Sequence, residues 1–125
     1  MNYLAVFIGG GIGSLMRFGM SMILPRDEGT FPWATFFANT AATVILALVV
    51  VWLGRDKTGH DQMWYLLLGI GLCGGFSTFS TFSLETIDLW RTGHAKLALL
   101  YSGATLVACL GAMAMVLSFL KQQHD

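Results

Sequence analysis

The chain has 125 residues, of which 55% are hydrophobic and only 11% are charged, and its mean hydropathy is +0.66. A soluble domain ordinarily carries about 25% charged residues, so this composition excludes an ordinary water-soluble fold and favours a membrane protein. Seven lysines and arginines balance seven aspartates and glutamates, which argues against a basic surface for nucleic acid. The length is that of one domain, residues 1–125.

Long apolar runs alternate with short polar connections along the chain. In chain order, the four runs cover residues 3–24, 31–53, 63–90 and 95–120. Each has the roughly 20 residues needed to cross about 30 Å of hydrocarbon, and it must be helical because lipid offers backbone groups no partners. Four soluble core helices are the alternative, but the second run has no charge and no polar face that water could cover. We therefore predict an all-α membrane domain with four transmembrane helices.

The basic residues do not favour one orientation of these helices in the membrane. Orientation normally follows an excess of lysine and arginine in the cytoplasmic loops. The two ends of the predicted bundle hold almost equal sets, namely Arg55, Lys57 and Lys121 against Arg26, Arg91, Lys96 and, if it reaches that interface, Arg17. A chain this balanced could insert both ways, and two opposite copies could form an antiparallel dimer. The alternative is that spacing or helix order still fixes one orientation.

The third run contains a segment that an ordinary helix tolerates poorly. Gly74 and Gly75 are adjacent, and hydroxyl residues follow them at Ser77, Thr78, Ser80, Thr81 and Ser83. Both features weaken a helix, and a single helix over residues 63–90 would be roughly 40 Å long, more than one straight span needs. We predict a third helix broken at its centre, near Gly74-Gly75, with freed carbonyls that can hold an alkali ion. Close helix packing through small residues is the alternative.

Three phenylalanines accompany these hydroxyl groups. Phe76, Phe79 and Phe82 are three residues apart and lie on one helical face. The edge of an aromatic ring carries positive potential, so edges that point inward can solvate an anion. A stripe that packs against lipid or protein is the alternative, but the alternation with serine and threonine is unusual for lipid contact. The pattern favours the wall of a pore.

A few polar residues interrupt the other runs. Tyr101, Thr105 and Cys109 follow the spacing i, i+4, i+8 and share one face of the fourth run, which indicates a thin polar stripe. An anchor at the membrane interface is the alternative for Tyr101. Arg17 near the end of the first run could snorkel to the interface, and Glu85 could belong to a solvated helix end. Because the sequence shows no nucleophile with a base, metal cluster or nucleotide loop, we predict that the protein is not an enzyme.

Three segments resemble the Fluc/CrcB family of fluoride channels. Residues 74–85 (GGFSTFSTFSLE) are similar to its third-span signature, residues 9–18 (GGGIGSLMRF) to its GGxxGAxxRY, and residues 32–39 (PWATFFAN) to its PxGTLxVN. With the length and the four spans, the resemblance covers almost the whole chain. The chain departs from the family pattern at Ser14 and Phe18, where alanine and tyrosine are usual, and at Ala34, Ala42 and Ala47, where the second span usually has glycine.

The resemblance implies a fluoride-selective channel of the bacterial inner membrane that exports fluoride down its electrochemical gradient and protects against fluoride toxicity. It implies an antiparallel, dual-topology homodimer with two pores, so the expected partners are fluoride, sodium, the lipid bilayer and a second copy of the chain. The implied pore residues are Asn39, Phe79, Phe82, Ser80, Thr81 and Tyr101. A structural Na⁺ at the dimer centre would be held by the backbone carbonyls of Gly74 and Ser77. Arg17 and Glu85 would have vestibule or structural roles.

Two other functions account for part of the pattern. A small dual-topology transporter of the multidrug type would couple to protons through a carboxylate well inside a span, and the first, second and fourth runs contain none. A non-transporting membrane subunit held together by glycine and methionine packing would leave the Phe/Ser/Thr pattern without a role. The sequence therefore favours the channel.

Overall fold

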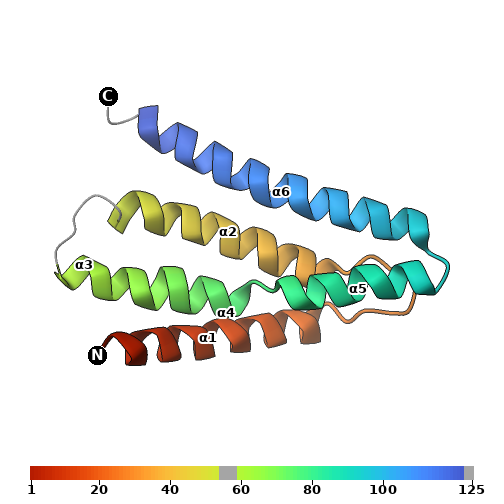
Figure 1. Cartoon of the computed structure of the whole chain (residues 1–125), viewed down its shortest axis with the longest axis horizontal. Coiled ribbons are helices and arrows are strands. Elements are labelled where there is room, and N and C mark those ends of the chain that lie inside the picture. The colour runs from red at the N-terminus through yellow and green to blue at the C-terminus, as the bar shows by residue number, and fades with distance from the viewer. Residues whose placement is uncertain (54–58, 123–125) are drawn as a thin grey trace.

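The structure, a computed structural model, describes residues 1–53 and 59–122. Every element in this part of the chain is helical, in the order α1 (Asn2–Ile23), α2 (Trp33–Leu53), α3 (Gly59–Trp64), η1 (Tyr65–Cys73), α4 (Gly74–Phe76), α5 (Phe79–Arg91) and α6 (Ala95–Gln122) (Figure 1). Four stretches are long and apolar enough to span a membrane: Asn2–Ile23, Trp33–Leu53, Asp61–Arg91 and Ala95–Phe119. The predicted four spans are confirmed, with ends that agree within two residues. The connection expected around 54–61 falls largely outside the described residues, as do Arg55, Lys57 and the side chain of Lys121.

The spans lie roughly side by side, with α1 and α6 at opposite edges (Figure 1). Helix α1 packs against η1 and α4, whereas α2 packs against both η1 and α6, and α6 also contacts α5. The N-terminus and the end of α6 lie at the same end of the molecule (Figure 1), as an even number of spans requires. The α1–α2 connection runs beside α5 at the opposite end.

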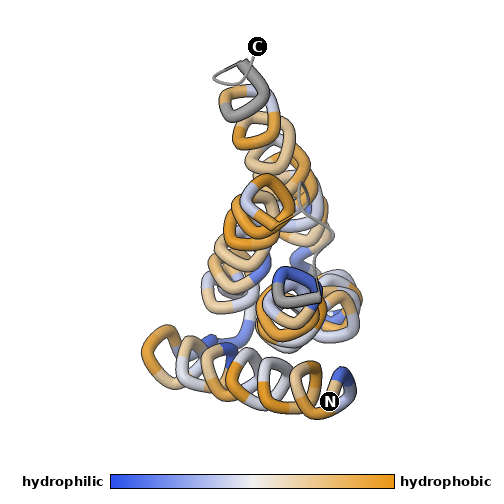
Figure 2. Tube along the Cα trace, turned by 90° about the vertical axis from the view of Figure 1, so that its left-hand side faces the viewer, coloured by the Kyte–Doolittle hydropathy of each residue, from blue (hydrophilic) through white to orange (hydrophobic). Residues whose placement is uncertain are grey.

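Hydrophobic residues predominate along the helices (Figure 2), and many large apolar side chains are exposed. Phe7, Trp52 and Leu110 are 77%, 84% and 70% exposed. In water such a surface would be strongly unfavourable, at about 25 cal/mol for each Å², whereas lipid tails are as apolar as these side chains. The chain is therefore built as a multi-pass membrane protein.

Small residues make the buried contacts of α2. Ala42 and Ala47, which stand where the resembling family usually has glycine, are fully buried. Ala42 packs with Ala38 and Phe76 in one of the two buried clusters of the described residues. The added methyl group at Ala42 thus fills the space beneath Phe76 and is part of the packing between α2 and α4.

Glycines bring α1 into backbone contact with the third span. Gly9 and Gly13 are buried and lie one turn apart on α1. A Cβ atom at Gly9 would overlap the carbonyl oxygen of Leu67, and one at Gly13 would overlap that of Leu72. Small residues four apart are a common means of close helix packing in membranes, and here they fix α1 against η1.

The first half of the third span is a π-helix, which the sequence analysis did not predict. Residues Tyr65–Cys73 form this helix, in which each N–H reaches the carbonyl five residues back and π-geometry is usually limited to one turn. Its buried glycines face different helices, since an added Cβ would meet Gly9 of α1 at Gly71 and Val49 of α2 at Gly69. The uniformly apolar sequence of η1 contains no signal for this geometry.

The third span keeps helical geometry through Gly74-Gly75, the residues near which a break was predicted, and departs from it two residues later. Gly74 has helical angles (φ −65°, ψ −37°), and α4 continues through Phe76. The backbone is instead extended at Ser77 and Thr78, where ψ is 156° and 117°, before α5 begins. Gly75 serves close packing, because a Cβ there would overlap the backbone of α1.

We expect Gly13→Ala to destabilise the protein, because the new methyl group would overlap the Leu72 carbonyl and part α1 from η1. Overpacking costs about 1–3 kcal/mol, and a clash with backbone belongs at the upper end of that range. Thermal unfolding of the purified protein in detergent measures the loss. Gly11→Ala is the matched control, since nothing lies within 4 Å of a Cβ at that position. Equal melting temperatures of the two variants would contradict the close α1–η1 contact.

Candidate functional site

Asn39 of α2 holds the extended backbone of the third span with both ends of its side-chain amide. The Thr78 N–H donates to Asn39 Oδ1 over 2.7 Å, and Asn39 Nδ2 donates to the Thr78 carbonyl over 3.2 Å. Both residues are buried, and hydrogen bonds shielded from water are stronger than exposed ones. The Asn39 side chain thereby replaces the helical partners that the Thr78 peptide groups would otherwise need.

The N–H groups of Thr78 and Thr81 have partners other than those of a continuous helix. In a continuous helix, the Thr78 N–H would donate to the Gly74 carbonyl and the Thr81 N–H to the Ser77 carbonyl. Instead, the former donates to Asn39 and the latter to Thr78 Oγ1, over 3.1 Å. Gly74 and Ser77, the two residues expected to hold sodium, thus lose their usual donors, and carbonyl oxygens are suitable ligands for a hard cation. Within residues 1–53 and 59–122, no group of three His, Cys, Asp or Glu side chains could hold a metal ion.

Thr78 also begins the helix that carries Phe79 and Phe82. Its hydroxyl accepts the Thr81 N–H as the N-cap of α5, an interaction that satisfies one of the free N–H groups at a helix start. The same hydroxyl donates to Thr81 Oγ1 over 3.1 Å and lies 3.3 Å from Ser80 Oγ. The structure therefore places Ser80 and Thr81, which were expected to line the pore, around the cap of α5.

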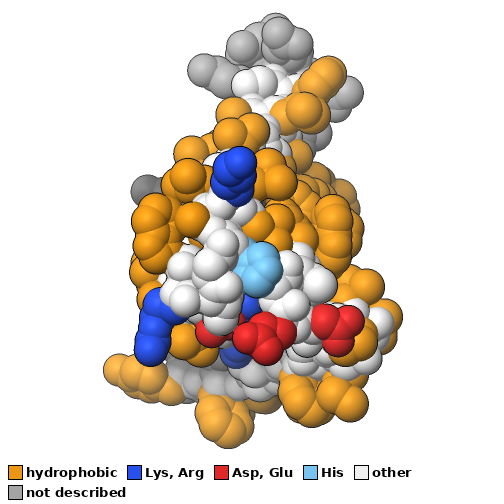
Figure 3. Space-filling view, turned by 90° about the vertical axis from the view of Figure 1, so that its right-hand side faces the viewer, with side chains coloured by type: hydrophobic (Ala, Val, Ile, Leu, Met, Phe, Trp, Pro, Cys, Tyr) orange, Lys and Arg blue, Asp and Glu red, His pale blue; other side chains and the backbone are white. Residues whose placement is uncertain are grey.

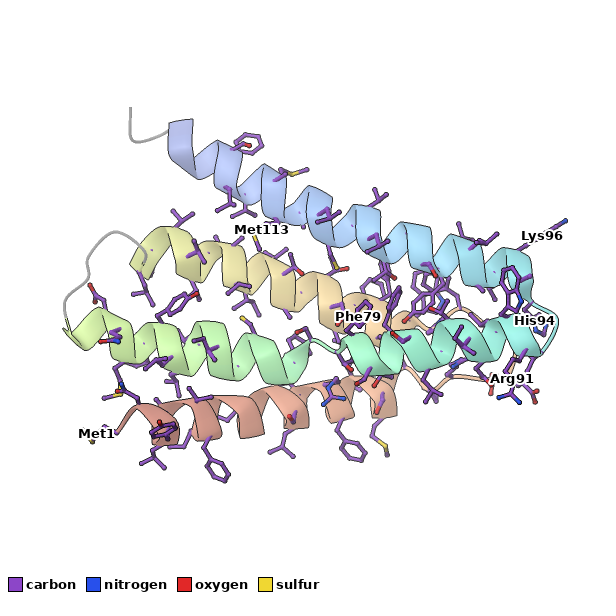
Figure 4. All side chains as sticks on the ribbon, in the orientation of Figure 1. Met1, Phe79, Arg91, His94, Lys96 and Met113 are labelled. Atoms are coloured by element: carbon purple, nitrogen blue, oxygen red, sulfur yellow. The ribbon has the colours of Figure 1, made fainter. Side chains whose placement is uncertain are left out.

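A cavity of about 230 Å³ lies beside this junction. Its walls come from α2, the extended segment, α5 and α6, and they include Asn39, Thr43, Ser77, Phe79, Phe82 and Thr105. Phe79 lies at the start of α5 (Figure 4). The structure brings the expected pore residues Asn39, Phe79 and Phe82 together here, whereas Ser80, Thr81 and Tyr101 do not line this cavity.

The cavity offers hydrogen-bond donors without a fixed charge. The rings of Phe79 and Phe82 lie 5.7 Å apart between centroids and are tilted by 40°. The Thr105 hydroxyl is buried and has no partner in the described part of the chain, and Asn39 Nδ2 has a second N–H besides the one bonded to Thr78. Ring edges, a hydroxyl and an amide N–H together suit a small anion. Thr105 and Cys109, on the predicted face of the fourth span, both line this cavity, and Thr43 was not foreseen.

Tyr101 lies behind Phe82 and binds Glu85. Its side chain is fully buried, which an interfacial anchor would not be, and its ring centroid is 5.2 Å from that of Phe82. The Tyr101 hydroxyl donates to Glu85 Oε2 over 2.7 Å, and the Thr35 hydroxyl donates to Glu85 Oε1 over 3.0 Å. Glu85 thus links α5 to both α6 and α2, while Tyr101 supports the ring of Phe82.

A second and more polar cleft, of about 380 Å³, shares Thr78 with the first cavity and opens between α1 and α5. It is lined by Arg17, Arg26 and Glu85, and by Ser14, Phe18 and Ala34, where the chain departs from the family pattern. Arg17 Nε donates to the Gly75 carbonyl over 3.1 Å. In a continuous helix that carbonyl would bond to the Phe79 N–H, so Arg17 caps a carbonyl at the end of α4.

Comparisons with known proteins agree with this architecture. Residues 4–117 match the family described as CrcB-like protein, Camphor Resistance (CrcB). A protein of Nitrobacter hamburgensis named fluoride-specific ion channel FluC 2 is 40% identical over 116 residues, which are 91% of this chain and 93% of the relative. Proteins named fluoride-specific ion channel FluC are 38% identical over 119 residues in Novosphingobium aromaticivorans (93% of each chain) and 40% identical over 111 residues in Klebsiella pneumoniae (89% of this chain, 84% of the relative). Because these matches extend over nearly the whole length, the chain belongs to the CrcB family of membrane ion channels, which are not enzymes.

Proposed function

We propose that the protein is a fluoride-selective channel that exports fluoride down its electrochemical gradient. The names of its relatives support this function. The observation that carries it is the convergence of Asn39, Phe79, Phe82 and Thr105, from three helices, on one cavity that has no fixed charge.

The chemistry of this wall suits fluoride. Fluoride is small and strongly hydrated, so a selective pore must replace its water with good donors. Conduction also requires that each contact be weak enough to release the ion. An amide N–H, a hydroxyl and ring edges meet both needs, whereas a fixed positive charge inside a span would hold the anion tightly. In this proposal a narrow wall excludes the larger halides.

The pore in this proposal is completed by a second copy in the opposite orientation. Phe79 is 77% exposed and Gly74 is also exposed in the single chain, whereas Ser77 and Phe82 are half-buried, so this region is only partly covered by the chain itself. A second copy packed on this surface would cover Phe79 and Gly74 and form two pores. The near-equal basic charge at the two ends supports dual topology.

The same surface supports a structural sodium ion at the dimer centre. The carbonyls of Gly74 and Ser77, which have lost their helical donors, would supply two oxygens from each copy. Sodium bound there would add positive potential near the pores without a basic side chain in the membrane. This proposal places the dimer in a bacterial inner membrane, where export would protect the cell against fluoride.

A dual-topology multidrug-type transporter is the alternative function. It would need a carboxylate that exchanges protons with a cationic substrate inside the membrane. The candidate is Glu85, but its two oxygens are held by the hydroxyls of Tyr101 and Thr35. These contacts favour a structural role for Glu85 and so support the channel.

We expect liposomes that contain the purified protein to release fluoride rapidly once an ionophore supplies the balancing current. The reason is that a channel moves net charge and is driven only by the gradient. A fluoride electrode measures the release, and liposomes loaded with chloride give the selectivity. Equal chloride release would contradict a fluoride-selective pore, and folded protein that releases neither ion would contradict the channel.

Replacement of the pore rings tests the aromatic wall. We expect Phe79→Ile and Phe82→Ile each to reduce fluoride release by at least about tenfold, because isoleucine has no positive ring edge to replace the water of the anion. Phe7→Ile is the matched control, since Phe7 is as exposed as Phe79 but lies on α1, away from the cavity. Fluoride release from liposomes and elution volume in detergent are measured together. If the variants lose both flux and assembly, the two rings hold the protein together by packing and do not form the wall of a pore.

The two hydrogen bonds between the Asn39 side chain and the Thr78 backbone, here called the Asn39 clamp, lead to a separate prediction. We expect Asn39→Asp to lower both melting temperature and flux at pH 8, because a carboxylate would face the Thr78 carbonyl where Asn39 donates. A lost buried hydrogen bond of this kind costs about 1–3 kcal/mol. Acidic pH should restore part of the stability, since a protonated carboxyl can donate again. Thr40→Val is the control, because the Thr40 hydroxyl bonds only to the Phe36 carbonyl of its own helix. A variant as stable as the wild type at pH 8 would argue against the clamp.

A further inference from the structure

The cleft between α1 and α5 carries a balanced set of charges. Arg17, Arg26 and Glu85 line it, and Asp88 pairs with Arg26 at 3.0 Å between Nη2 and Oδ2. Two positive and two negative groups therefore offset each other. Figure 3 shows acidic and basic side chains gathered on the end of the molecule where α5 meets the α1–α2 connection.

Two of these four groups are engaged by the protein itself. Arg17 donates to the Gly75 carbonyl, and Glu85 accepts from two hydroxyls. Their positions are set by the junction of the third span. Arg26 and Asp88 differ, because within residues 1–53 and 59–122 the only side-chain hydrogen bond of either residue is the one between them, which joins the α1–α2 connection to α5.

Arg26 is held with unused donor capacity inside the cleft. Its Nε atom is buried, and it has no hydrogen-bond partner in the described part of the chain. A guanidinium has five N–H donors, and the bond to Asp88 uses only Nη2. A buried donor without an acceptor is unfavourable by about 1–3 kcal/mol. Arg26 thus lies in the cleft as a donor suited to a small anion.

Asp88 can limit the strength of such a contact. Its side chain is 51% exposed, compared with 23% for Arg26, so water can solvate Asp88 when an anion displaces it from the guanidinium. An exposed ion pair contributes little net stability, about 0–1 kcal/mol. The exchange of Asp88 for an incoming anion therefore requires little free energy in either direction.

We propose that Arg26 contacts the anion as it enters the cleft, and that Asp88 competes for Arg26 and so sets the rate of entry at low anion concentration. The ligand class is a small monovalent anion, which is fluoride under the channel function proposed above, on which this inference rests. Removal of Asp88 leaves the cleft with one net positive charge, whereas removal of the Arg26 charge leaves it with one net negative charge.

The test is the initial rate of fluoride release at low fluoride, measured at low and high concentrations of a salt whose ions do not permeate. We expect Asp88→Asn to raise the rate about twofold at low salt, the size expected for one unit charge acting over roughly 10 Å of water. Arg26→Gln should lower the rate to at least a similar extent. Both effects should shrink at high salt, because the screening length falls from about 30 Å at 0.01 M to about 3 Å at 1 M.

The double variant R26Q/D88N tests whether the effect of Asp88 on the rate depends on Arg26. We expect it to release fluoride no faster than Arg26→Gln alone, because the gain of Asp88→Asn requires the Arg26 guanidinium, whereas a general charge effect of Asp88 would make it about twofold faster. Arg91→Gln is the matched control, since Arg91 is exposed near the same end but does not line the cleft (Figure 4). If the pair only fixes the α1–α2 connection, both single variants should lose melting temperature and flux equally at all salt concentrations.

The outcomes distinguish this inference from the proposed function. Wild-type liposomes that release fluoride normally, with Asp88→Asn no faster at low salt, would overturn the role of the Arg26–Asp88 pair and leave the channel intact. A double variant that releases fluoride faster than Arg26→Gln would also overturn it, because the effect of Asp88 would then not depend on Arg26. Folded wild-type protein that releases no fluoride would overturn both.

Discussion

The two hydrogen bonds between the Asn39 amide and the Thr78 peptide groups are the interaction on which the rest of the site depends. A backbone group without a partner in hydrocarbon costs several kcal/mol, so a span can leave helical geometry only where other groups take over. Asn39 satisfies both Thr78 groups, and Arg17 satisfies the Gly75 carbonyl. These two side chains permit the extended backbone at Ser77 and Thr78, which sets the direction in which α5 begins.

The same exchange of partners has consequences on two sides of the junction. On one side, it places Phe79 and Phe82 beside Asn39 in a shared cavity. On the other, Asn39 takes the donor of the Gly74 carbonyl, and the Thr78 hydroxyl takes that of the Ser77 carbonyl. Carbonyls without helical donors are what the proposed sodium site requires, and a continuous helix would provide neither feature. Pore wall and cation ligands are therefore not independent parts of the proposal, because both depend on the hydrogen bonds made at Thr78.

The sequence predicted those features that depend on composition and local pattern. The four spans follow from long apolar runs, Phe79 and Phe82 were singled out by the spacing of rings among hydroxyl residues, and Asn39 was identified through the family resemblance. The features it missed depend on partners far along the chain. The extended residues are Ser77 and Thr78, just after the glycine pair near which a break was predicted, and their position depends on Asn39, which is 39 positions from Thr78 in the sequence. Likewise, Tyr101 binds Glu85 across two helices, and the π-geometry of η1 has no counterpart in its uniformly apolar sequence.

The distribution of charge around Thr78 is itself consistent with an anion pathway. The charged groups lie in the cleft toward the end of the molecule, where water and dissolved ions weaken their fields. The cavity beyond Thr78 contains only neutral donors, in a region where a fixed charge would act with little screening. Arg17 and Glu85, the charged residues nearest the junction, are each held by neutral partners from other helices. An entering anion would thus first meet charged groups that offset one another and are screened by water, and then weak, closely spaced neutral donors. This order favours entry without trapping the ion inside the membrane.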